Sequence, residues 1–223
     1  MTELTDGDSI GGFTYREIPT VEVDAVEARF LPLAEAVRRL NDAVIRSTAD
    51  DTLLTDAVAR IDELTRQLGE GAPPGPVGTC FNHEGRSWSW GNAAVGERNA
   101  VAPPLYLRFV DDTHVVGEAD LGPAYEGPPG MVHGGVSALL LDHLMGVTAS
   151  HRHTQTAFTG TLTMRYEATL PLGKVTLHAE LVKQERRKID VEATIVATDG
   201  TVAIRAHGVF ITPRWAAELS EDR

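Results

Sequence analysis

The sequence contains a single cysteine, few basic residues and no long apolar run. Cys80 has no second cysteine with which to form a disulfide within the chain, and such usage is typical of a reducing compartment. The 20 Lys and Arg residues against 32 Asp and Glu residues give a formal net charge of -12, which disfavours nucleic acids and anionic membranes as partners. No stretch approaches the roughly 18 apolar residues of a membrane span, and the N-terminus lacks the pattern of an export signal. We therefore expect a cytoplasmic protein without nucleic-acid or membrane partners.

The first third of the sequence predicts a helical extension. Apolar residues recur at spacings of three and four over residues 24–47 and again over 52–69, as on one face of a helix. Neither helix can cover its own apolar face. The pair is therefore expected either to pack on a larger body or to serve as a lid or partner-binding module. We expect an arm and two-helix extension over residues 1–70, with the arm irregular over 1–20.

A region without periodicity follows the predicted helices. Residues 69–78 are rich in Gly and Pro, a composition typical of a linker. Residues 79–104 contain two tryptophans and several asparagines but show no convincing period. We expect a linker and a loop-rich lead-in over residues 71–104.

Residues 105–215 predict an antiparallel sheet around one helix. Residues 136–150 are apolar on nearly all sides, the pattern of a helix buried on most faces. No other helix in this half of the chain could cover a sheet. We therefore expect an α+β fold in which about five to six strands wrap one long central helix. The strands predicted from alternating patterns and tight turns are 105–110, 113–121, 157–168, 175–185, 189–197 and 201–211.

The most informative stretch is residues 127–146, in which a Gly-Pro-Pro-Gly loop leads into the apolar helix. His133, Gly134 and Gly135 stand at the helix start. Free N–H groups and the positive end of the helix dipole can bind a negatively charged oxygen there. Asp142 interrupts the apolar run, although an unpaired buried carboxylate is energetically costly. A carboxylate kept in such a position indicates a functional site.

In these features the chain resembles the hotdog-fold acyl-CoA thioesterases. Within them it is most similar to the phenylacetate-type branch and to human thioesterase superfamily members with a helical N-terminal extension. The resemblance implies a hotdog domain over residues 105–215, a homodimer or dimer of dimers with the site at the subunit interface, and no cofactor. It also implies hydrolysis of acyl-CoA or acyl-carrier thioesters to a free acid and a thiol, in lipid metabolism. The alternative is a non-catalytic hotdog protein that binds acyl-CoA or acyl chains; a hydratase relative is disfavoured, because the expected Asp-His pair is not evident.

The resemblance also implies roles for individual residues. The Gly134 amide would form the oxyanion hole, and Asp142 would act as the base or nucleophile, assisted by Thr159. His133 would orient the loop or donate to the thioester carbonyl, and Gly135 would let the ligand approach the backbone. Two interpretations of the basic run remain open: a solvated turn, or a site for the phosphates of coenzyme A. That run comprises Arg186, Arg187 and Lys188.

One departure from the family pattern affects the water-activating group. Some members carry an Asn or Gln six residues before the His, and Gly127 occupies that place here. Asp142 would then position the attacking water together with Thr159. Asp142 also follows His133 by about 2.5 helical turns, too far for both to serve one thioester from one chain. The sequence therefore predicts two half-sites that a second copy completes.

Two further patterns are not expected to carry chemistry. The His-Gly-Gly-Val-Ser run is similar to the oxyanion loop of serine esterases, but Ser137 is not followed by the Gly of a nucleophile elbow. His151 and His153 lack acidic or cysteine neighbours, so no metal site is expected. The length and nature of the acyl group are not predicted by the sequence.

Overall fold

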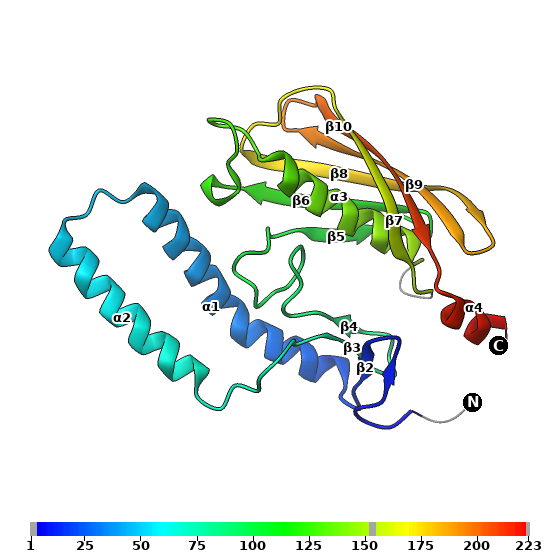
Figure 1. Cartoon of the computed structure of the whole chain (residues 1–223), viewed down its shortest axis with the longest axis horizontal. Coiled ribbons are helices and arrows are strands. Elements are labelled where there is room, and N and C mark those ends of the chain that lie inside the picture. The colour runs from blue at the N-terminus through cyan, green and yellow to red at the C-terminus, as the bar shows by residue number, and fades with distance from the viewer. Residues whose placement is uncertain (1–3, 152–154, 222–223) are drawn as a thin grey trace.

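The structure is a computed structural model that describes residues 4–151 and 155–221, with side chains to Ala217. Figure 1 shows a six-stranded sheet with a central helix along one face, a small second sheet beside it, and a helical hairpin that projects from this body. The two ends of the described chain lie on the same side of the molecule.

The large sheet and its helix form the predicted α+β hotdog fold. The six strands are antiparallel in the order β5-β6-β8-β9-β10-β7. The central helix α3 spans Gly134–Ala149, slightly shorter than predicted. The strands are β5 (Tyr106–Phe109), β6 (His114–Leu121), β7 (Phe158–Tyr166), β8 (Gly173–Glu185), β9 (Lys188–Ala197) and β10 (Val202–Ile211).

The core lies between α3 and the concave face of this sheet. Leucine and methionine side chains of α3 are fully buried against apolar residues of β8, β9 and β10. Each such side chain contributes roughly 1.5–3 kcal/mol through removal of its surface from water. Gly208 of β10 keeps the contact close, since a Cβ there would come within 2.8 Å of the Met145 methyl group. The buried α3 side chains at the centre of this core are Leu140, Leu141, Leu144 and Met145.

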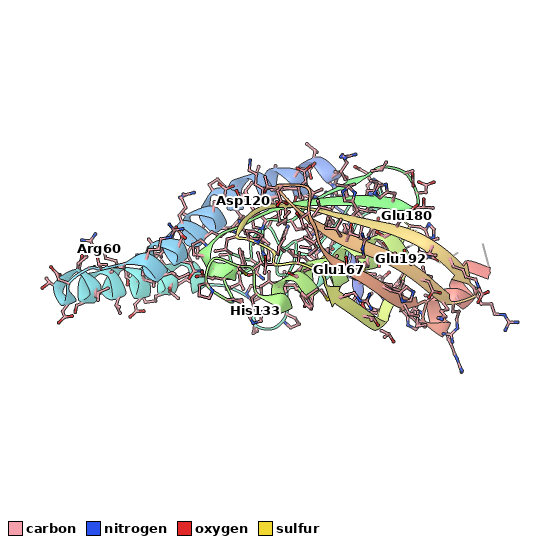
Figure 2. All side chains as sticks on the ribbon, turned by 90° about the horizontal axis from the view of Figure 1, so that it is seen from above. Arg60, Asp120, His133, Glu167, Glu180 and Glu192 are labelled. Atoms are coloured by element: carbon pink, nitrogen blue, oxygen red, sulfur yellow. The ribbon has the colours of Figure 1, made fainter. Side chains whose placement is uncertain are left out.

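The two predicted N-terminal helices are present as α1 (Thr20–Arg46) and α2 (Asp51–Gly69). Asp50 caps α2 by accepting a hydrogen bond from the Leu53 N–H at 2.9 Å. None of the described α2 residues is buried, and its apolar stripe is exposed. Figure 2 shows Arg60, at the middle of α2, on the projecting hairpin and away from His133. No helix within the described residues is both long and apolar enough to cross a membrane.

The expectation of an irregular arm over residues 1–20 is wrong in part. β1 (Ser9–Ile10) and β2 (Phe13–Tyr15) form a hairpin, and β2 pairs in parallel with β3 (Thr79–Phe81), which pairs with β4 (Ser87–Trp88). Strands of two or three residues are too short to show a period, and their pairing joins segments far apart in the sequence. The division of the chain at residues 70 and 104 stays a prediction.

The C-terminal helix α4 (Arg214–Glu221) reaches the small sheet. The Trp215 ring lies against Gly11, where any Cβ would collide with it. Gly11 also has a φ of +58, a conformation that side chains other than glycine rarely adopt. The two ends of the chain are therefore joined by an aromatic contact.

A buried polar cluster attaches α1 to the lead-in. The Glu27 carboxylate of α1 accepts a hydrogen bond from the Trp90 indole N–H at 3.1 Å and pairs with the Arg86 guanidinium. The Arg98 guanidinium stacks on the rings of Phe30 and Trp90, at 3.8 and 3.5 Å from their centroids. Burial raises the pKa of Glu27, and the nearby Arg86 opposes that rise only in part. The lead-in is therefore fixed to α1 by a carboxylate that is costly to ionise.

We expect this carboxylate to make stability depend on pH. Because the folded pKa of Glu27 is raised, its contribution is full below the unfolded pKa and is lost as the pH rises through the folded pKa. As the pH rises from about 4 to neutrality, the free energy of unfolding of wild type should therefore fall relative to that of Glu27→Gln. Urea denaturation of both proteins across this range measures the difference, with Glu35→Gln, on the exposed face of α1, as the control. If the free energy of unfolding of wild type rises with pH relative to that of Glu27→Gln, the raised pKa of Glu27 is contradicted.

Candidate active site

A loop held by backbone hydrogen bonds places His133 at the start of α3. The Gly127 N–H donates to the Met131 carbonyl at 2.8 Å, and the Met131 N–H donates to the Pro128 carbonyl at 2.9 Å. Gly130 takes a φ of +73 in this turn, which explains the glycine. The His133 N–H then donates to the Tyr125 carbonyl at 2.9 Å. These bonds fix the entry path that the Gly-Pro-Pro-Gly pattern predicts.

His133 caps the helix with its ring. Its Nδ1 atom accepts a hydrogen bond from the Gly135 N–H at 3.0 Å. An Nδ1 atom that accepts this bond carries no proton, which leaves Nε2 as the ring nitrogen that can donate. The ring is exposed and leaves its Nε2–H available. Of the two roles considered for His133, orienting the loop has a direct geometric basis.

Gly134 and Gly135 differ in whether the backbone N–H group is free to bind a substrate. The Gly135 N–H donates to the His133 ring and is therefore not free to bind a substrate. Gly135 is exposed, so the rest of its backbone can still contact one. The Gly134 N–H makes no hydrogen bond to any described residue, as expected for the first residue of a helix. The Gly134 carbonyl accepts a hydrogen bond from the Tyr166 hydroxyl at 2.9 Å. Tyr166 thereby positions the predicted oxyanion donor, a role the sequence did not show.

The structure brings Asp142 and Thr159 together within one chain. The Thr159 hydroxyl donates to Asp142 Oδ1 at 2.8 Å. Asp142 is half-buried rather than enclosed, because the α3 face that carries Leu139, Asp142 and Gly146 is only partly covered. Among the residues that the structure describes, Thr159 is the one side chain that bonds this carboxylate, which remains open on the uncovered face.

A β-bulge aims Thr159 at the helix. Leu162 and Met164 of β7 pack against the core, so strict alternation would turn Thr159 away from α3. The pairing with β10 skips Gly160, and this extra residue shifts the alternation by one. Glycine suits the bulge, since a Cβ at Gly160 would lie 3.2 Å from the Val209 carbonyl oxygen. An isolated glycine inside a strand pattern was the one sequence signal for it.

The two polar groups lie on one rigid element, with Gly134 at the start of α3 and Asp142 near its middle. Gly134 and Asp142 are eight residues apart on α3, which corresponds to about 12 Å along its axis. β7 shares this polarity, with Tyr166 bonded near Gly134 and Thr159 bonded to Asp142. Within one chain, the free Gly134 N–H and the Asp142 carboxylate therefore do not meet.

The predicted basic run forms the tight turn between β8 and β9. Lys188 pairs with Ile211, which pairs with Phe158, so the turn lies at the Thr159 end of the sheet. Arg187 donates to the Thr212 carbonyl at 3.0 Å, and Lys188 lies 3.9 Å from Asp190. Arg186 is exposed and makes no ion pair with the described residues. Of the three basic residues, Arg186 and Lys188 therefore have the side-chain charges most accessible to a ligand.

The His-x-His pattern is described only in part. His151 Nε2 lies 3.1 Å from Gln184 Oε1, whereas Arg152 and His153 lie outside the described residues. The expectation that this pattern holds no metal stays a prediction.

The fold agrees with a comparison to known proteins. Residues 129–204 match the profile described as "Thioesterase superfamily". A solved thioesterase superfamily protein is 32% identical, with a TM-score of 0.71 over 82% of this chain and 90% of that chain. The chain belongs to the thioesterase superfamily. This thioesterase shares more than residues 105–215 with that relative, so part of the N-terminal extension is common to both.

Further solved structures match the hotdog domain of the thioesterase at lower similarity. Conserved protein PA5202 from Pseudomonas aeruginosa is 22% identical over 49% of this chain and 89% of that chain, with a TM-score of 0.46. A hypothetical thioesterase from Streptococcus pneumoniae, solved with coenzyme A, is 20% identical over 49% of this chain and 85% of that chain, also at 0.46. Membership of the superfamily indicates hydrolysis of a thioester and does not identify the branch.

We expect Thr159→Val to lower kcat by about tenfold to a hundredfold, because it removes a hydrogen bond to a charged group without changing the side-chain shape. Thr159→Ser should keep most of the activity. Thiol release from a thioester substrate measures both, and Thr161→Val on the same strand is the matched control. Unchanged kcat in Thr159→Val would show that the Asp142 contact has no part in turnover.

Proposed function

We propose that the protein hydrolyses acyl-CoA thioesters at sites completed by a second copy of the chain. The observation that carries this proposal is the Asp142–Thr159 pair, held at 2.8 Å yet about 12 Å along α3 from the unused Gly134 N–H. A thioester carbonyl must contact both an oxyanion donor and an activated water. Within one chain no single carbonyl can do so.

The open edge of β7 supports association with a second copy. β7 is an edge strand of nine residues, and Phe158 and Tyr166 near its ends are 50% and 55% exposed. A long open edge of this kind is a site for pairing with another strand. Antiparallel pairing of two β7 strands about Leu162 would set Tyr166 of one copy beside Phe158 of the other. The Gly134 end of each chain would then approach the Asp142 end of its mate, giving two sites per homodimer.

The groups at such a site suit ester-type hydrolysis. The Gly134 N–H, at the positive end of α3, would stabilise the oxyanion that forms on the thioester carbonyl. Asp142, with Oδ1 held by Thr159, would take a proton from water as that water attacks the carbonyl carbon. The C–S bond then breaks, and the proton passes to the departing thiolate. Asp142 acting instead as a nucleophile would use the same two contacts.

The basic turn supports coenzyme A as the leaving group. In a chain of net charge -12, Arg186 and Lys188 form a local basic cluster at the carboxylate end of the sheet. Guanidinium and ammonium groups are the usual protein ligands of phosphates. This placement favours an acyl-CoA enzyme of the phenylacetate-type branch over one that acts on a small thioester without phosphates.

The shared site predicts complementation between two inactive variants. Gly134→Pro removes the N–H while proline remains favoured at the first position of a helix, and Asp142→Asn removes the base while keeping a hydrogen-bond acceptor for Thr159. Each variant alone should lose at least about a hundredfold in kcat. Co-expressed together, they should recover about one quarter of wild-type activity, since half of the dimers are mixed and each mixed dimer has one intact site.

The controls separate this result from a general loss of folding. Gly134→Ala adds a Cβ yet keeps the N–H, and should retain far more activity than Gly134→Pro. Sedimentation should show a dimer for every variant. Mixtures that remain inactive, although mixed dimers are present, would place both groups of a site in one chain and contradict the proposal.

A second test concerns the basic turn. Arg186 has a φ of +53, so Arg186→Asn removes the charge and places a residue that tolerates this conformation. We expect KM for acyl-CoA to rise about threefold to tenfold with little change in kcat, and to become less sensitive to salt. Arg60→Asn, on α2 of the projecting hairpin and away from His133, is the matched control (Figure 2). An unchanged KM would contradict a phosphate-binding role and support the alternative interpretation of a solvated turn.

A further inference from the structure

Ser137 is a buried hydroxyl without a partner. It lies one turn into α3, is 1% exposed, and its Oγ makes no hydrogen bond to the described residues. Buried serines and threonines in helices usually bond to a carbonyl of the preceding turn. Thr148 and Ser150 of the same region do so, with the carbonyls of Leu144 and Val147 at 2.9 and 2.8 Å. A buried polar atom left unpaired is costly and indicates a missing partner.

Ser137 faces a hollow beside the start of α3. The hollow has a volume of about 450 Å³ and is also lined by Gly134 and Tyr166. Its buried lining is otherwise apolar, and the exposed residues around it carry no positive charge. The buried members are Val132, Leu170 and Ile204, and the exposed ones include Pro128, Glu167 and Thr169.

The chemistry of this lining restricts what can occupy it. A hydroxyl both donates and accepts, so Ser137 can bond an alcohol or a ketone oxygen. A carboxylate is disfavoured, because none of the lining residues is Lys or Arg and the Arg205 guanidinium next to Glu167 is already paired with the Glu167 carboxylate at 3.2 Å. Ser137 follows Gly134 by three residues, or about 4.5 Å along the helix. That spacing suits an oxygen close to the thioester carbonyl rather than at the end of a long chain.

We propose that this hollow binds the acyl part of the substrate and that Ser137 selects acyl groups with a neutral oxygen on the carbon β to the thioester. The 3-hydroxyacyl and 3-oxoacyl thioesters are the substrate class that fits. The inference rests on the proposed thioesterase function and on Gly134 as its oxyanion donor. It assigns Ser137 to specificity, not to the chemical step.

The test compares matched substrates. Values of kcat/KM are measured for butyryl-CoA and for each enantiomer of 3-hydroxybutyryl-CoA with wild type, Ser137→Ala and Ser150→Ala. Wild type should prefer one hydroxyacyl substrate by about tenfold. Ser137→Ala should bring that preference close to parity, whereas Ser150→Ala, which removes a buried hydroxyl that already has a partner, should retain it. The same preference in wild type and Ser137→Ala, or no preference in wild type, overturns the inference while leaving the hydrolase function intact.

A binding measurement separates the two proposals if no CoA ester is hydrolysed. Calorimetry gives the dissociation constants of butyryl-CoA and 3-hydroxybutyryl-CoA for wild type and Ser137→Ala. Tighter binding of the hydroxyacyl ester that is lost in Ser137→Ala would sustain the inference even though the catalytic proposal had failed. Equal affinities, or no binding of either ester, would overturn it. Ser137→Ala should also melt no lower than wild type, since it removes an unpaired group; a clear loss of melting temperature would show that Oγ has a structural bond.

Discussion

The packing of α3 into the concave face of the sheet is the constraint on which the rest of the structure depends. Leu140, Leu141 and Leu144 bury one side of the helix completely, which fixes its rotation and its position along the strands. The side that carries Asp142 is left partly open. A rigid helix then sets the spacing between its N-terminus and this carboxylate, and no side-chain movement can close about 12 Å. The separation of Gly134 from Asp142, on which the proposed half-sites rest, is therefore a direct result of core packing.

The same packing fixes the groups of each proposed half-site. At one end, the His133 ring and the Tyr166 hydroxyl take up the polar groups around Gly134 and leave its N–H unused. At the other end, the bulge at Gly160 turns Thr159 toward Asp142. Both sets of contacts hold their groups in place without a substrate. Preorganisation of this kind makes donors and bases effective, because little rearrangement is left for the reaction.

The N-terminal extension is joined to the molecule by different forces. A buried carboxylate, Glu27, and the stacked Arg98 attach α1 to the lead-in, and the Trp215 contact joins the C-terminus to the small sheet. None of the described α2 residues is buried, and the apolar stripe of α2 is exposed; Figure 1 shows α2 on the projecting side of the hairpin. Because the 32%-identical relative shares part of this extension, the extension belongs to the protein's wider group rather than to this chain alone. α1 also contacts the 3-10 helix Pro123–Tyr125, whose Tyr125 carbonyl accepts the His133 N–H, so this part of the extension lies next to the loop that leads into α3.

Local patterns in the sequence determined much of this protein. Periodicity predicted α1, α2, α3 and the six strands of the large sheet, since burial on one side imposes a repeat that is visible in neighbouring residues. The His-Gly-Gly start and the carboxylate in an apolar helix indicated both half-sites, and the family resemblance added Thr159. The short strands β1 to β4, the bulge at Gly160, the capture of the Gly135 N–H by His133 and the unpaired Ser137 were decided only by the tertiary structure. Each depends on which distant segments meet and in what register, and packing sets that register while no local repeat records it.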